Sequence, residues 1–129
     1  MSVIPYGKQC IEDDDIEAVV SVLKSDFLTQ GPVIGQFEDK FKQKVNAKYA
    51  ICVSNGTAAL HLSLLALGIG PGDEVITTPN SFLATANAIL YVGATPVFVD
   101  IELDQFGIDA TKIEAAITKN TKAIIPVHF

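Results

Sequence analysis

Short apolar runs alternate with helical patterns between residues 49 and 127, and this alternation limits the chain to few folds. Runs of strand length are expected at 49–53, 75–78, 95–99 and 123–127. Apolar residues recur at helical spacing over 57–67, 81–91 and 110–117. Short connections of this kind join parallel strands to helices that pack on the sheet. The pattern predicts an α/β fold in three layers, with a mainly parallel sheet and flanking helices.

Two more helices are expected before the first run. Asp13, Asp14 and Asp15 precede a helical pattern, and acidic residues suit the positive end of a helix dipole. A metal site is the alternative for such a triplet, but the helix start explains it and no metal is predicted. The second helix is expected over Val33 to Val45. Its buried stripe is predicted to contain Ile34, Phe37, Phe41 and Val45.

Composition excludes several classes of protein. The 129 residues carry a net charge of -6 and the basic residues are nine Lys with no Arg, which argues against a nucleic-acid partner. No apolar run approaches the roughly 20 residues of a membrane span. Cys10 and Cys52 are too few for a disulfide framework, so a reducing, cytoplasmic location is expected. Cys52 lies in the first apolar run and is predicted to be a core residue.

A small polar turn separates the first apolar run from the helix after it. Ser54, Asn55, Gly56 and Thr57 are turn and capping residues. Backbone N–H groups at a helix start attract anions, Thr57 adds a hydroxyl, and Gly56 allows close approach. These residues could therefore form a phosphate-binding cup. They could also only cap the helix, and the pattern alone leaves both interpretations open.

Ligands of parallel sheets bind at the carboxyl ends of the strands. Three groups of residues are expected there: Ser54 to Thr57, Asn80 to Phe82, and Asp100. Phe82 follows a helix start, where a ring is hard to bury. It could face a ligand or could cover the end of the sheet.

Four motifs resemble the DegT/DnrJ/StrS family of sugar aminotransferases in order and spacing. They are 54–60 (SNGTAAL), 70–75 (GPGDEV), 78–88 (TPNSFLATANA) and 93–100 (GATPVFVD). The resemblance implies the type I fold and the cofactor pyridoxal phosphate. Further motifs narrow it to members that make UDP-4-amino-4,6-dideoxy-N-acetyl-β-L-altrosamine, a step towards pseudaminic acid. They are 4–7 (IPYG), 13–16 (DDDI) and 28–32 (LTQGP).

The resemblance also implies roles for single residues. Gly56, Thr57 and Ala58 would hold the cofactor phosphate, and Phe82 would stack on the pyridine ring. The nucleotide-sugar site would be lined by Tyr6, Asp26, Phe27, Leu28, Thr29 and Gly56. Residues 1–32 would form an N-terminal helix and substrate-loop segment. Residues 33–129 would form part of the cofactor-binding large domain.

No catalytic residue is assigned within the chain. The family's Schiff-base Lys and the Asp that pairs with the pyridine nitrogen lie beyond a segment of which Val127, His128 and Phe129 are the start. The chain is therefore expected to be an inactive N-terminal third of a homodimeric enzyme. That enzyme would move an amino group from L-glutamate to a UDP-linked 4-keto-6-deoxy-N-acetylhexosamine. The alternative is a non-catalytic regulator that binds pyridoxal phosphate or a nucleotide sugar.

Overall fold

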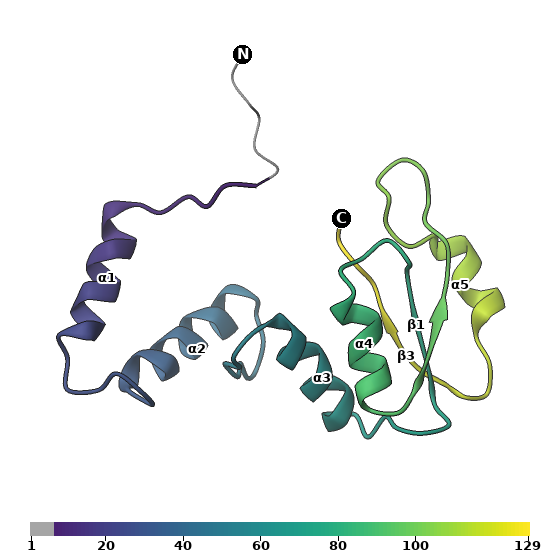
Figure 1. Cartoon of the computed structure of the whole chain (residues 1–129), viewed down its shortest axis with the longest axis horizontal. Helices are drawn as coiled ribbons and strands as arrows, with labels where there is room; N and C mark the ends of the chain where they lie inside the picture. The colour runs from purple at the N-terminus through teal and green to yellow at the C-terminus, as the bar shows by residue number, and fades with distance from the viewer. Residues whose placement is uncertain (1–6) are drawn as a thin grey trace, which may run out of the picture. The chain divides into compact units, whose positions relative to one another are not determined.

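The computed structural model describes residues 7–129, and the contacts divide the chain into two compact units. Unit 1 extends to Cys52 and contains the helices α1 (Asp13–Leu23) and α2 (Pro32–Lys44). Unit 2 comprises Val53–Phe129 and contains the sheet (Figure 1). Its elements are, in order, α3 (Gly56–Ala66), β1 (Glu74–Thr77), α4 (Ala84–Tyr91), β2 (Thr95–Phe98), α5 (Ala110–Ala116) and β3 (Thr121–Ile125).

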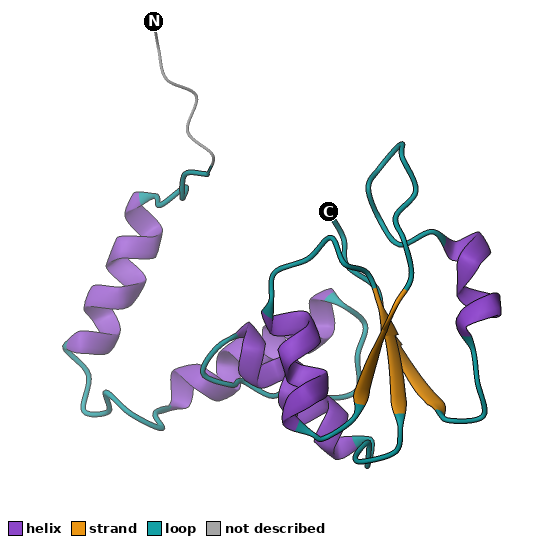
Figure 2. Ribbon diagram, turned by 45° about the vertical axis from the view of Figure 1, so that its right-hand side comes forward, coloured by secondary structure: helices purple, strands orange, loops and turns teal. Residues whose placement is uncertain are grey.

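The sheet of unit 2 has three parallel strands in the order β2-β1-β3. Val75 of the central strand lies opposite Pro96 on one side and Ala123 on the other. Helices α3 and α4 lie on one side of the strands and α5 on the other (Figure 2). The predicted fold class, a parallel sheet between layers of helices, is confirmed. The boundaries differ by a few residues, because Ser81 to Leu83 form a turn before α4 and β3 begins two residues early.

The core of the chain lies between β1 and the two helices beside it. The buried cluster contains Leu64, Ile69, Val75, Ala88, Ile89, Val92 and Ala94. The neighbouring Ile76 points to the opposite face of the sheet and is also fully buried, as expected for the central strand of a sheet that is covered on both sides. Thr77 is buried too, and its hydroxyl donates to the carbonyl oxygen of Ile125 at 3.0 Å, which ties β1 to β3.

The strand expected over Tyr49 to Val53 does not form. Among the described residues this run pairs with no strand, and Ile51 is 82% exposed. Cys52, predicted to be buried, is exposed as well. Its N–H donates to the carboxylate of Glu38 at 2.7 Å in place of a strand ladder. Strand propensity cannot substitute for a neighbouring strand, because the backbone groups of a strand are satisfied only by a partner.

The helices of unit 1 form where the sequence predicts them. The side chain of Asp15 accepts the N–H of Glu12 at 3.0 Å and completes a capping box, so the acidic triplet does start α1. The expected burial is wrong: among the residues described, α1 and α2 contain no buried residue, and Phe37 and Phe41 are 58% and 50% exposed. Amphipathic spacing fixes which face is apolar but not whether a partner covers it.

Candidate functional site

Helix α3 begins with a side-chain cap. The side-chain oxygen of Asn55 accepts the N–H of Ala58 at 2.9 Å, which satisfies one donor of the first turn. No hydrogen bond within the described part of the chain uses the N–H groups of Gly56 and Thr57. The capping interpretation and the anion interpretation are therefore compatible. The cap uses one donor, and two backbone donors and the Thr57 hydroxyl remain.

The approach to these donors is open. Gly56 is exposed, and no heavy atom lies within 4 Å of the place where a Cβ would stand. Thr57 and Ala58 are half-buried, so their backbone is fixed by the helix while one side is accessible. Such a helix start suits an anion, because the backbone donors and the helix dipole both favour negative charge. One correction applies: this turn does not follow a strand, so its predicted place at the carboxyl edge is not observed.

Phe82 lies in the turn between β1 and α4. Its ring is 81% exposed, so it does not cover the end of the sheet. The turn itself is well connected. The N–H of Thr85 donates to the carbonyl oxygen of Phe82 at 3.0 Å, and the hydroxyls of Ser81 and Thr85 lie 2.6 Å apart. The chain thus presents an aromatic face to the surroundings on a fixed backbone.

The carboxyl ends of the three strands meet in one apolar pocket. Its volume is 490 Å³, and it is lined by Pro79, Asn80, Ile101, Phe106 and Phe129. Pro79 and Asn80 follow β1, Ile101 follows β2, and Phe129 follows β3. The side-chain amide of Asn80 donates to the carbonyl oxygen of Phe106 at 3.2 Å. The sequence did not indicate this link, because 26 residues separate its partners.

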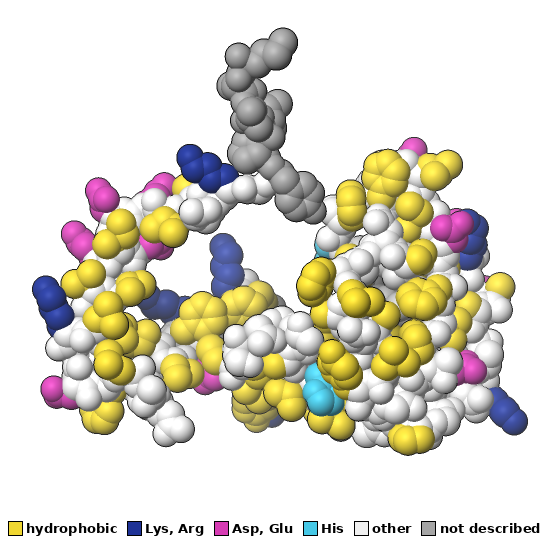
Figure 3. All heavy atoms as spheres, in the orientation of Figure 1, with side chains coloured by type: hydrophobic (Ala, Val, Ile, Leu, Met, Phe, Trp, Pro, Cys, Tyr) yellow, Lys and Arg dark blue, Asp and Glu magenta, His cyan; other side chains and the backbone are white. Residues whose placement is uncertain are grey.

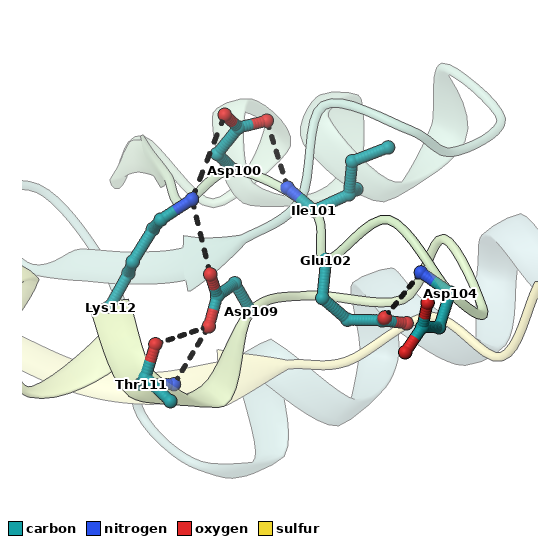
Figure 4. A network of polar contacts seen from close by, with 7 residues as sticks. All are labelled: Asp100, Ile101, Glu102, Asp104, Asp109, Thr111 and Lys112. Atoms are coloured by element: carbon teal, nitrogen blue, oxygen red, sulfur yellow. Dashed lines mark hydrogen bonds and ion pairs between the residues drawn. The ribbon is translucent and has the colours of Figure 1, made fainter.

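Asp100 lies at the carboxyl end of β2, as predicted, and belongs to a charged network (Figure 4). The ammonium group of Lys112 lies 3.9 Å from Asp100 and 3.1 Å from Asp109. Hydrogen bonds from the side chains of Thr111 and Lys112 lower the pKa of Asp109 below its usual 3.8. The backbone N–H of Asp109 also donates to the carbonyl oxygen of Asp100 at 2.8 Å. This network closes the loop between β2 and α5, which is a structural role.

Of the residues expected to contact a nucleotide sugar, Asp26, Phe27, Leu28 and Thr29 lie in unit 1 and Gly56 lies in unit 2. Asp26 to Thr29 form an exposed loop after α1, and Phe27 and Leu28 are 60% and 65% exposed. The hydroxyl of Ser25 bonds to the carbonyl oxygens of Val22 and Phe27, which holds the loop to the end of the helix. Tyr6 lies outside the described residues.

From residue 7 to residue 129, no group of three or more His, Cys, Asp or Glu side chains could hold a metal ion. None of the helices in that range combines the length and the apolar character that a membrane crossing requires.

Residues 9–129 match the model of the DegT/DnrJ/EryC1/StrS aminotransferase family. The chain belongs to this family. One protein similar to this chain is the spore coat polysaccharide biosynthesis protein SpsC of Bacillus subtilis (strain 168). The two are 51% identical over 126 residues, which are 98% of this chain and 32% of SpsC.

Solved structures show the same fold. The aminotransferase from Psychrobacter cryohalolentis has a TM-score of 0.88 at 39% identity, over 97% of this chain and 32% of its own. NtdA from Bacillus subtilis, with bound cofactor PMP, has a TM-score of 0.84 at 46% identity, and the match covers 92% of this chain and 28% of NtdA. Spr1654 from Streptococcus pneumoniae in its PLP form has a TM-score of 0.86 at 40% identity, and the match covers 94% of this chain and 31% of Spr1654. The DegT/DnrJ/EryC1/StrS chain described here thus spans about a third of its relatives' length.

Proposed function

We propose that this chain is the N-terminal part of a pyridoxal-phosphate-dependent sugar aminotransferase. The observation that carries the proposal is the start of α3, where the N–H groups of Gly56 and Thr57 make no hydrogen bond within the described residues and the space beside Gly56 is open. Family membership supports it, as do the solved PLP and PMP forms of relatives. The residues present therefore fit the cofactor's phosphate.

Each residue of the cup has a separate role in this proposal. The N–H groups of Gly56 and Thr57 and the Thr57 hydroxyl donate to the phosphate, and these 129 residues supply no Arg to it. Ala58 takes part only if Asn55 releases its N–H group. Phe82 covers one face of the pyridine ring. When bound, pyridoxal phosphate supplies an electron sink, which stabilises the negative charge that develops as protons are moved during transamination.

The proposed substrates follow the narrower resemblance. The amino group of L-glutamate is moved to the 4-keto carbon of a UDP-linked 4-keto-6-deoxy-N-acetylhexosamine, in the biosynthesis of a pseudaminic-acid-type or related surface polysaccharide. The relative SpsC, named for spore coat polysaccharide biosynthesis, supports the broader part of this assignment. Tyr6, Asp26, Phe27, Leu28, Thr29 and Gly56 contact the nucleotide sugar. The enzyme is a cytoplasmic homodimer, and its Schiff-base Lys and its Asp for the pyridine nitrogen follow Phe129.

The test uses the longer polypeptide that contains this chain. Pyridoxal phosphate is titrated by visible absorbance, and L-glutamate and the keto sugar are then supplied while amino-sugar formation is followed by mass spectrometry. We expect saturable binding and transfer. Binding without transfer would favour the regulatory alternative, and the absence of binding would refute the proposal.

A further inference from the structure

Asn80 connects two loops at the carboxyl edge of the sheet. Its N–H donates to the hydroxyl of Thr78 at 3.3 Å, and its side-chain amide donates to the carbonyl oxygen of Phe106 at 3.2 Å. Thr78 directly follows β1 and is only 2% exposed. Asn80 is therefore fixed to the buried centre of the sheet on one side and to the loop after β2 on the other.

The partner of Asn80 is held in an unusual conformation. Phe106 has a φ of 59°, in the left-handed region that residues with a side chain rarely adopt. The loop around it is closed, since the N–H of Glu102 donates to the carbonyl oxygen of Gly107 at 3.0 Å. A backbone outlier persists only when its surroundings determine it. Here the surroundings are this closure, the Asn80 amide and the ring of Phe129, 5.9 Å away.

Phe82 stands two residues after Asn80. With 81% of its surface exposed, its ring has almost no packing that could fix its position. The place of the ring depends on the backbone of the turn. On the α4 side the turn is fixed by the hydroxyls of Ser81 and Thr85. On the side of the sheet it is fixed by the two hydrogen bonds of Asn80.

We propose that Asn80 is a positioning residue that holds the turn of Phe82 so that its ring lies against the cofactor. The inference rests on the proposed function, because it assigns Asn80 a role toward the same pyridine ring. Asn80 itself does not need to touch the cofactor. It acts through the backbone between residues 80 and 82, and the loop at Phe106 is its anchor.

The test compares two identical chemical changes in the longer protein. Asn80→Asp keeps the size of the side chain and the backbone N–H but removes the side-chain amide donor. The carbonyl oxygen of Phe106 then faces a carboxylate. Asn120→Asp makes the same change at an exposed side chain in the turn before β3, at the other end of the sheet. The measurements are the dissociation constant of pyridoxal phosphate, the visible circular dichroism of the bound cofactor, and the urea midpoint of the cofactor-free protein.

We expect Asn80→Asp to raise the dissociation constant about fivefold and to reduce the cofactor's circular dichroism, with no change for Asn120→Asp. A double-mutant cycle separates positioning from stability: in the Phe82→Ala background, Asn80→Asp is expected to have no further effect on affinity. Additive effects, or an unchanged dichroism, would overturn the inference. If Asn80→Asp does not fold, Asn80→Ala enters the same cycle. Wild-type protein that binds no cofactor would instead refute the proposed function.

Discussion

At the start of α3, one side-chain oxygen determines how many backbone donors an anion can reach. Asn55 occupies the N–H of Ala58, so Gly56 and Thr57 supply the accessible donors. Among the donors at this helix start, the hydroxyl of Thr57 therefore adds the side-chain contact to the proposed phosphate site. A hydrogen bond to a charged group contributes on the order of 1.5–3 kcal/mol.

Thr57→Val is therefore expected to weaken the binding of pyridoxal phosphate by the longer protein about tenfold or more. The substitution removes the hydroxyl and retains the shape of the side chain. Thr57→Ser is the control, because it keeps the hydroxyl and should bind within a fewfold of wild type. Absorbance titration measures both. Equal affinities for wild type and Thr57→Val would remove Thr57 from the site.

Phe82→Ala is expected to weaken cofactor binding by about 1 kcal/mol, because it removes the face on which the pyridine ring would stack. Phe82→Tyr keeps an aromatic face and should retain most of the affinity. Since the ring is 81% exposed, neither change should alter the urea midpoint of the cofactor-free protein by much. A large fall in that midpoint without a change in affinity would show that Phe82 stabilises the fold.

At the scale of elements, the end of α4 depends on a glycine. Gly93 has a φ of 78°, and a Cβ there would lie 3.0 Å from Cγ of Pro71. Gly72, with a φ of 90°, is the matched control because nothing lies within 4 Å of its Cβ position. An alanine in the left-handed backbone region lowers the stability of the fold by about 1–2 kcal/mol at either site.

Gly93→Ala is expected to lower the free energy of unfolding by about 1 kcal/mol more than Gly72→Ala does, because only the first adds a steric contact. Urea unfolding of the two variants of this chain measures the difference. Equal losses would show that Pro71 moves aside freely.

The loop between β2 and α5 should depend on pH through Asp109. Its pKa is lowered below 3.8 in the folded state, first by the hydrogen bond from Thr111 and then by Lys112. A carboxyl group whose pKa is lower in the folded state stabilises the fold at pH values above its pKa in the unfolded state. This contribution is lost as the pH falls through its pKa in the folded state.

Wild type should therefore exceed Asp109→Asn in unfolding free energy by a constant margin above ~pH 5, and the margin should shrink below pH 3.8. Asn is the suitable replacement because it still caps a helix. Denaturant unfolding across this pH range gives the margin. A margin that persists at pH 2 would show that the charge of Asp109 is not involved.

At the scale of the whole molecule, the described core belongs to unit 2, whereas the described residues of unit 1 leave both helices without buried side chains. Large apolar side chains are exposed in both units, and many are visible on the face drawn in Figure 3. Contiguous apolar patches are typical of surfaces that meet other protein. They agree with a chain that spans about a third of its relatives.

The 129-residue chain is expected to form no specific covalent adduct with pyridoxal phosphate. None of its nine Lys stands at the position that the family resemblance assigns to the Schiff-base Lys, so no amine is positioned to form the imine. Borohydride reduction followed by peptide mapping checks this. A stoichiometric label on one Lys, together with amino transfer, would show that the chain is a complete enzyme.

Much of unit 2 could be predicted from the sequence, because its signals are local. Alternating apolar runs and short turns indicate a parallel α/β arrangement, and Asn55 and Asp109 cap helices where capping residues are expected. The cup at Gly56 and Thr57 could be proposed for the same reason, since a helix start and its polar turn are adjacent in the chain.

Other features depended on the tertiary structure, because they arise between residues far apart in the chain. Tyr49 to Val53 has the composition of a strand but no strand beside it, so it stays exposed. The stripe of Phe37 and Phe41 has the right spacing, but burial requires a surface that covers it. The bond from Asn80 to Phe106 spans 26 residues and follows from the parallel packing of β1 and β2, which brings their carboxyl ends together. Sequence periodicity specifies which atoms are available for contact, and the packing of the sheet decides which of them meet.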